Sequence, residues 1–157
     1  MLKWTWLSAL VIVLDQLTKQ IAERTLNLYA QVEVMPHFNL TLAYNEGAAF
    51  SFLSDAGGWQ RWFFSALAIG VSVVILIWLH TMKSTERLQA VALALILGGA
   101  IGNVIDRILF GHVIDFIDLY YQQYHWPAFN IADSAIVVGA ALIIIHALFF
   151  DLRKPDE

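Results

Sequence analysis

The 157-residue sequence contains no cysteine and few charged residues. Without thiols, the chain cannot form disulfide bonds, thiol nucleophiles, zinc–thiolate sites or iron–sulfur clusters. Charged residues make up 14% of the chain, whereas a soluble domain carries about a quarter. The net charge of −4 is not accompanied by a basic stripe, which argues against a nucleic-acid partner.

Hydrophobic residues are abundant instead. They account for 59% of the chain, and the mean hydropathy is +0.65. Four apolar segments approach the length of about 17–25 residues that a helix needs to cross a bilayer core. They cover residues 4–21, 62–79, 88–109 and 132–150. The sequence therefore predicts an all-α membrane protein, a four-transmembrane-helix bundle that forms a single domain over residues 1–157.

The first segment resembles a signal peptide because Lys3 precedes it. Asp15 and Lys19 follow the apolar stretch, however, and no small-residue cleavage site does, so we expect a retained helix. With four spans, the N-terminus, the second connection and the C-terminus share one side, and they carry Lys3, Lys83, Arg87, Arg153 and Lys154. The positive-inside rule then predicts two cytoplasmic termini and places the first and third connections outside.

The first connection changes its hydrophobic period to two. In the stretch "VEVMPHFNLTLAYNEGAAFSFL", apolar residues alternate with polar ones up to the "NEG" turn. Such alternation is typical of strands. We therefore expect a small extracytoplasmic β-sheet at residues 30–53, between the first two helices.

The third span contains a small-residue face and then a polar turn. Gly98 and Gly102 favour close helix approach in lipid. Asn103, Asp106 and Arg107 follow at spacings of three and four, so they share one helix side. The simplest structural interpretation of Asp106 and Arg107 is an ion pair at the membrane boundary. Asp15 and Lys19, four apart, are expected to neutralise one another in the same way.

Two aspartates flank the third connection. Asp115 follows the third span and Asp133 opens the fourth, so both are expected at the outer boundary. Paired carboxylates can hydrolyse a peptide without a metal: the ionised one takes a proton from water, and the protonated one hydrogen-bonds the scissile carbonyl. The structural alternative for Asp133 is a helix N-cap. The spacing of His112, Asp115 and Asp118 leaves a metal site as a further alternative, and otherwise we expect Asp118 to be solvated or interfacial.

Five sequence blocks resemble lipoprotein signal peptidases (signal peptidase II), the aspartyl proteases of the bacterial inner membrane. The blocks are "DQLTK" at 15–19, "YNEGAAFS" at 44–51, "GNVIDRI" at 102–108, "GHVIDFID" at 111–118 and "FNIADSAI" at 129–136. They stand in the family's order, and the resemblance covers essentially the whole chain.

The resemblance implies a function and a site. The catalytic pair falls on Asp115 and Asp133, and the supporting residues are Asp15, Asn45, Asn103, Asp106, Arg107 and Asn130. Gly47 lies in the "NEGAAF" turn, which we expect to act as a mobile clamp over the substrate. The implied substrate is a prolipoprotein with a diacylglyceryl-modified cysteine, cut on the N-terminal side of that cysteine. The expected enzyme is a monomer in membrane lipid, with no metal or other cofactor.

A different class of protein remains as an alternative. In a small non-enzymatic transporter, buried Asp and Arg residues would line an ion or proton path through the membrane. Polar residues should then continue to the cytoplasmic side, but the inner halves of the last three spans are apolar except for His146.

Overall fold

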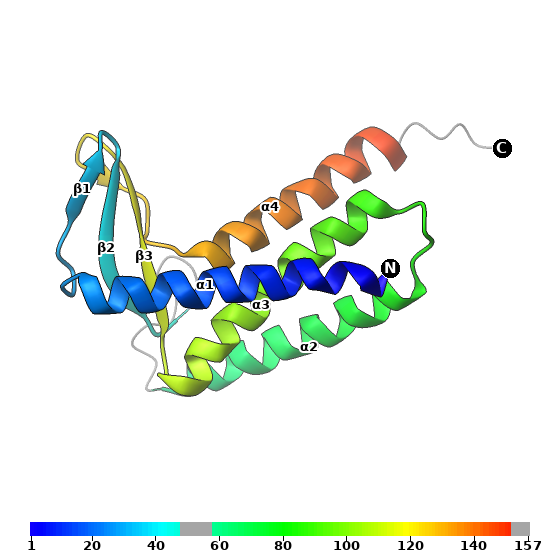
Figure 1. Ribbon diagram of the computed structural model, residues 1–157, viewed down its shortest axis with the longest axis horizontal. Helices are drawn as coiled ribbons and strands as arrows, with labels where there is room; N and C mark the ends of the chain where they lie inside the picture. The colour runs from blue at the N-terminus through cyan, green and yellow to red at the C-terminus, as the bar shows by residue number, and fades with distance from the viewer. Residues whose placement is uncertain (48–57, 152–157) are drawn as a thin grey trace.

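The protein is described by a computed structural model over residues 1–47 and 58–151. Its long helices are α1 (Thr5–Thr25), α2 (Trp59–Thr81), α3 (Arg87–Leu109) and α4 (Ile131–His146). A short 3-10 helix, η1 (Leu2–Trp4), precedes α1, and a π-helical turn, η3 (Ala147–Asp151), continues α4. The long helices run along the longest axis of the molecule (Figure 1).

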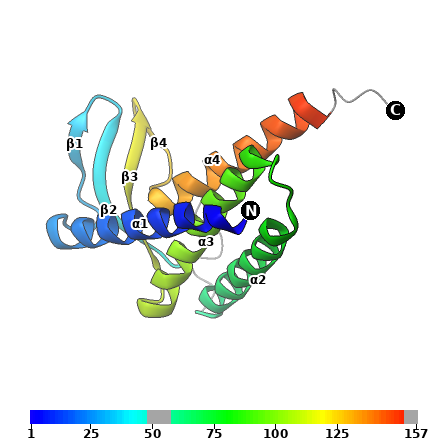
Figure 2. The ribbon, with the colours of Figure 1, turned by 45° about the vertical axis from the view of Figure 1, so that its right-hand side comes forward.

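The two ends of the bundle differ. The start of α1, the turn between α2 and α3 and the end of α4 lie at one end, and a β-sheet stands across the other end in both views (Figures 1 and 2). The polar connection between the second and third apolar segments thus joins an antiparallel helix pair.

Within the described residues, α2, α3 and the helix from Ile131 to Phe149 are long and apolar enough to cross a membrane. In α3, 61% of the apolar window is buried inside the protein, against 22% in α2 and 17% in the last helix. The protein is therefore a helical membrane-type protein in which α3 is the central helix. The outer faces of its neighbours are apolar and exposed.

Helix α1 is polar on its inner face and apolar on its outer face. Ser8, Asp15 and Lys19 are buried. The exposed face carries large apolar side chains: Trp6, Leu10, Val13, Leu14, Leu17 and Ile21. A helix on a water-soluble protein has the opposite distribution, whereas ionisable residues of membrane helices face the bundle interior. The distribution in α1 therefore fits a lipid environment.

Small residues allow α1 and α3 to approach closely, as predicted from the glycine pair. A Cβ atom at Gly98 would lie 2.8 Å from the Ser8 carbonyl oxygen, and one at Gly102 would lie 2.7 Å from Asp15 Oδ2. In the same interface, Ser8 Oγ donates a 2.7 Å hydrogen bond to the Ala94 carbonyl. Only glycine fits such contacts without displacing the partner helix.

The sheet contains β1 (Val32–Met35), β2 (Phe38–Asn45), β3 (Val113–Tyr121) and β4 (Tyr124–His125), all antiparallel and in sequence order. The strands expected in the first connection are confirmed up to Asn45; residues 48–53 of the predicted β region lie outside the described residues. The sheet is not confined to that connection, however, because β3 and β4 come from the third. The first four residues of β3 are all buried, so this strand lacks the alternation that reveals a strand in sequence.

Candidate active site

Asp115 and Asp133 meet at the junction of the sheet and the bundle. Asp115 lies on β3 and is 2% exposed, and Asp133 lies in the first turn of α4. Asn130 contacts both carboxylates: its Nδ2 donates to Asp115 Oδ1 over 2.7 Å, and its backbone N–H donates to Asp133 Oδ2 over 3.3 Å. The two predicted catalytic residues thus share one hydrogen-bond partner.

The start of α4 is a capping box. Asn130 is the N-cap, and its Oδ1 accepts a 2.9 Å hydrogen bond from the Asp133 N–H. Asp133 is the third helical residue, and its carboxylate in turn accepts a hydrogen bond from the Asn130 N–H. The alternative that Asp133 is itself the N-cap is therefore wrong by three positions. Its carboxylate still lies at the positive end of the helix dipole, which favours an anion.

Asn103 on α3 extends this arrangement into the bundle. Its Nδ2 donates to Asp133 Oδ1 over 2.8 Å. Its Oδ1 accepts from Asn130 Nδ2 at 3.2 Å and from Lys19 Nζ at 2.9 Å. The Asn103 amide therefore orients Asp133 and connects it to the charges of α1.

A buried charge cluster lies beneath the dyad. Lys19 Nζ is 2.8 Å from both Asp15 Oδ2 and Asp106 Oδ2, and all three side chains are at most 1% exposed. Asp15 Oδ1 accepts from the Ala132 N–H over 2.9 Å, and Asp106 Oδ2 accepts from the Ile114 N–H over 3.1 Å. These two amides immediately precede Asp133 and Asp115 in the chain. The cluster therefore fixes the backbone next to each member of the dyad.

The expected ion pair between Asp106 and Arg107 is wrong. Asp106 is paired with Lys19 of α1, while Arg107 Nη2 donates to the Gly47 carbonyl over 2.9 Å. The Arg107 guanidinium carbon also lies 5.6 Å from the centroid of the Phe64 ring. Consecutive residues of a helix project in different directions, so Asp106 faces α1 whereas Arg107 faces the sheet end.

The end of β2 supports Asp115 from the other side. Asn45 Nδ2 donates to Asp115 Oδ2 over 3.1 Å, and Asn45 Oδ1 accepts from the Gly47 N–H over 3.1 Å. Gly47 therefore acts through its backbone, which orients Asn45 and accepts from Arg107. The rest of the expected clamp, from residue 48 onward, lies outside the described residues.

The environment of Asp115 favours its protonated form. Burial raises the pKa of this carboxyl to about 7, and the nearby charge of Asp133 acts in the same direction. Hydrogen bonds from Asn45 and Asn130 oppose the shift, because they stabilise the anion. Asp115 therefore holds a proton up to near-neutral pH.

The expectation that Asp118 is solvated is also wrong. Asp118 is 4% exposed, accepts a 2.9 Å hydrogen bond from Asn39 Nδ2 and contacts His125 Nδ1 at 2.9 and 3.0 Å. His112 instead stacks on Tyr44, with 4.1 Å between ring centroids. Across residues 1–47 and 58–151, no three His, Asp or Glu side chains are grouped as metal ligands.

The set of site residues predicted from the sequence omits Lys19. The sequence does predict its pairing with Asp15, which is confirmed, but its contacts with Asp106 and Asn103 arise only when α1 packs on α3. A usable signal was the lysine itself, because a buried cation in a membrane helix needs acidic partners, and Asp106 is available on another span.

The candidate site pairs a buried carboxylate, Asp115, with a half-buried one, Asp133, at the sheet end of an apolar helix bundle. Two structures described as bacterial membrane enzymes, solved by the in meso method, are similar to this chain. The first has a TM-score of 0.88 and 34% identity and covers 100% of this chain and 94% of its own. The second has a TM-score of 0.82 and 36% identity, and it covers 96% of this chain and 95% of its own.

Sequence comparisons give the family. The family model "Signal peptidase (SPase) II" matches residues 7–149. A lipoprotein signal peptidase of Alteromonas mediterranea is 58% identical over 99% of this chain and 86% of its own length. A lipoprotein signal peptidase of Ectopseudomonas mendocina is 56% identical over 99% of this chain and 90% of its own length. The chain belongs to the signal peptidase II family, and the resemblance found in the sequence blocks is confirmed.

Proposed function

We propose that this chain is an intramembrane aspartic endopeptidase that removes the signal peptide from diacylglyceryl-modified prolipoproteins. It cuts on the N-terminal side of the lipidated cysteine. One observation carries the proposal: Asn130 holds the Asp115 and Asp133 carboxylates at one place, at the sheet end of an apolar bundle. The relatives named lipoprotein signal peptidases supply the substrate class.

The contacts of the dyad support a division of labour. Asp115, with its pKa raised to about 7, keeps a proton and donates it in a hydrogen bond to the scissile carbonyl oxygen. The Asp133 carboxylate accepts hydrogen bonds from Asn103 Nδ2 and from the Asn130 N–H at the positive end of α4. These contacts favour its role as the base that takes a proton from the attacking water. The water oxygen bonds to the carbonyl carbon, and the C–N bond then breaks. Asp133 returns the proton that it took from water to the leaving nitrogen, which becomes the new amine of the cysteine. No covalent enzyme intermediate and no cofactor takes part.

The proposal includes a topology in the bacterial inner membrane. Helix α1 also crosses the membrane, which brings the number of spans to four. Its apolar face lies in lipid and its polar face is turned toward α3. Lys3 lies just before α1, Lys83 lies between α2 and α3, and Arg87 opens α3. The start of α1 and the turn between α2 and α3 lie at the end of the bundle away from the sheet (Figure 1). The positive-inside rule assigns that end, with both termini, to the cytoplasm. The sheet and the dyad then lie at the periplasmic surface of a monomer.

The transporter alternative is disfavoured by family membership. It also requires a polar path through the bundle. The buried charged side chains of the described residues are Asp15, Lys19, Asp106, Asp115 and Asp118, and they gather toward the sheet. At the other end, buried residues such as Ile75, Leu79 and Leu93 form an apolar cluster.

The experiment uses the purified protein in lipid nanodiscs. It is given one synthetic precursor with a diacylglyceryl-modified cysteine and an otherwise identical precursor with a free cysteine. Mass spectrometry should find a single cut before the modified cysteine and little cleavage of the unmodified peptide. Equal cleavage of both, or a cut elsewhere, would contradict the proposed substrate. Loss of activity on adding a chelator would favour a metal-dependent reaction instead.

A further inference from the structure

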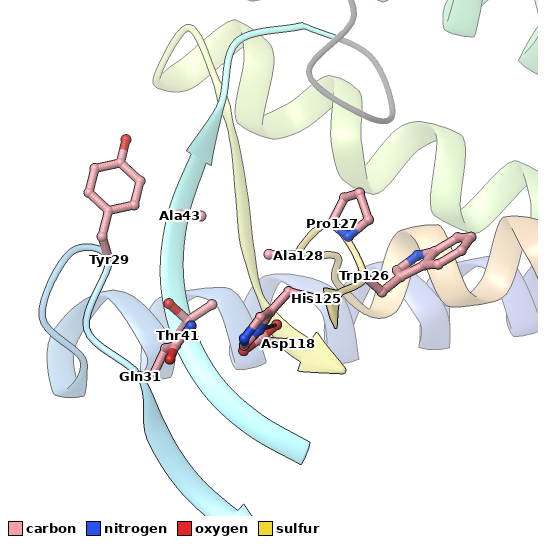
Figure 3. Close-up of a pocket in the computed structure, with 9 residues that line it drawn as sticks. All are labelled: Tyr29, Gln31, Thr41, Ala43, Asp118, His125, Trp126, Pro127 and Ala128. Atoms are coloured by element: carbon pink, nitrogen blue, oxygen red, sulfur yellow. Dashed lines mark hydrogen bonds and ion pairs between the residues drawn. The ribbon is translucent and has the colours of Figure 1, made fainter. Parts of the chain in front are cut away.

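A groove of about 620 Å³ lies beside β2 (Figure 3). Gln31 lines it from the segment before β1, and Thr41 and Ala43 line it from β2. The opposite wall is the segment 125–128, which leads from β4 toward α4. The mechanism proposed above does not use this groove.

A contact between the exposed His125 and the buried Asp118 forms part of the groove lining. His125 Nδ1 lies 2.9 Å from Asp118 Oδ1, and Asn39 Nδ2 donates to the same carboxylate. The His125 ring is also stacked on Tyr120, with 5.3 Å between centroids and 19° between planes. Because a carboxylate accepts from Nδ1, that nitrogen carries the proton. The second ring nitrogen, Nε2, then remains available to an occupant, and the His125 side chain is 38% exposed.

The groove is continuous with the dyad along two segments. Ala43 is the ladder partner of Asp115 in the pairing of β2 with β3. Ala128, on the other wall, is followed two residues later by Asn130, which contacts both catalytic carboxylates. A peptide with its scissile bond at the dyad can therefore continue directly into the groove.

We propose that this groove binds the segment of the substrate that follows the lipidated cysteine, with His125 as a specificity-determining residue. The inference rests on the proposed function. The acyl chains keep the cysteine at the membrane boundary, so the following residues must leave across the sheet. An extended peptide needs partners for its N–H and C=O groups, and the groove offers His125 Nε2, the Thr41 hydroxyl and the Gln31 amide.

The charge of the lining favours a peptide over a lipid headgroup. Among the described residues that line the groove, the titratable ones are Tyr29, Asp118 and His125, and neither Lys nor Arg is present. A phosphate would meet the Asp118 carboxylate with only a histidine to balance it. Phosphate sites in proteins use Arg, Lys or clustered backbone N–H groups instead.

The test compares two lipidated precursors that are identical through the cysteine. The short one ends at a cysteine amide, and the long one continues for about six residues, a length that spans roughly 20 Å when extended. The measured quantity is the ratio of kcat/KM for the long precursor to that for the short one. His125→Asn retains a donor toward Asp118 but lacks Nε2. Gln31→Ala removes an exposed amide at the other wall, and His37→Asn, in the turn between β1 and β2, is the matched control.

The ratio should fall about 2- to 10-fold in His125→Asn and in Gln31→Ala, as expected for one lost hydrogen bond, and stay at the wild-type value in His37→Asn. An unchanged ratio in both groove variants, or an equal loss with both precursors, overturns the proposal. A kcat/KM ratio that changes with the anionic lipid content of the nanodisc also overturns the proposal, because it would indicate a site for lipid headgroups. Failure of the wild-type protein to cut either precursor would contradict the proposed function itself. If His125→Asn does not fold, Gln31→Ala decides the question.

Discussion

Asn130 donates a 2.7 Å hydrogen bond to Asp115 while it serves as the N-cap of the helix that carries Asp133. One fully buried amide thus positions a residue of the sheet and a residue of the bundle. The two halves of the proposed catalytic pair come from different layers of the molecule, and their geometry depends on this side chain.

Replacing Asn130 by Asp separates its two roles. Aspartate is a good N-cap, so α4 should retain its start, but the donor to Asp115 is lost. A hydrogen bond to a charged group contributes about 1.5–3 kcal/mol, so kcat should fall roughly 10- to 100-fold. The new carboxyl group would stand at a fully buried position beside Asp115, so Tm should fall as well. The exposed Asn27→Asp is the matched control and should keep wild-type turnover. A normal kcat in Asn130→Asp would show that Asn130 does not position the dyad.

The pH dependence follows from the pKa of Asp115. Its value of about 7 in the folded protein exceeds the ordinary 3.8. Between these two pH values, the folded protein therefore holds a proton on Asp115 that the unfolded chain has released. The unfolding free energy should therefore decrease as pH rises from about 4 to 7. The kcat/KM should fall above about pH 7, where Asp115 loses the proton used for catalysis.

The Asp133→Asn variant tests the cause of that shift. Removing the neighbouring charge should lower the pKa of Asp115, because that charge contributes to the elevated value. Infrared difference spectra of the carboxyl C=O band, recorded against pH, should detect the shift. The exposed Glu33→Gln should leave the titration of Asp115 unchanged. An identical titration in Asp133→Asn and the wild-type protein would contradict the close approach of the two carboxylates.

Lys19→Met should destabilise the protein strongly. The substitution leaves Asp15 and Asp106 as buried charges without their shared cation, and breaking a buried pair costs about 3–5 kcal/mol. Thermal unfolding in detergent measures the loss, and the exposed Lys3→Met is the control. Adding Asp106→Asn to Lys19→Met should recover part of the stability, because one uncompensated charge disappears. A double variant less stable than Lys19→Met would contradict the electrostatic explanation.

Gly102→Ala tests the close contact between α1 and α3. The new Cβ would lie 2.7 Å from Asp15 Oδ2 and 3.3 Å from the Ala132 side chain. Overpacking of this kind costs about 1–3 kcal/mol, so Tm should fall. Gly70→Ala is the matched control within α2, because nothing lies within 4 Å of its added Cβ. Equal Tm changes in the two variants would show that the interface tolerates the methyl group.

Local sequence signals predict some parts of this molecule well. The apolar runs identify α2, α3 and α4, and the period-two stretch identifies β1 and β2. Asp115 and Asp133 are identifiable because carboxylates beside apolar spans are costly. The family blocks add Asn45, Asn103 and Asn130.

Long-range packing explains what the sequence does not predict. Strand β3 is buried along its first half, so it shows no alternation, and its strand character arises from pairing with β2, about 70 residues earlier in the chain. Likewise, Asp118 becomes buried because Asn39 and His125 supply its hydrogen bonds. No pattern within a few residues of Asp118 reveals those partners.

The central claim is that Asp115 and Asp133 together perform the cleavage. The decisive measurement is the single-turnover cleavage rate of a diacylglyceryl-modified precursor by purified Asp115→Asn and Asp133→Asn, with Glu33→Gln as control and circular dichroism to verify folding. Each dyad variant should lose about 10²- to 10⁴-fold or more in rate, as expected when a general acid or base is removed, while the control retains wild-type activity. A folded Asp115→Asn or Asp133→Asn protein that cleaves at the wild-type rate would contradict the account.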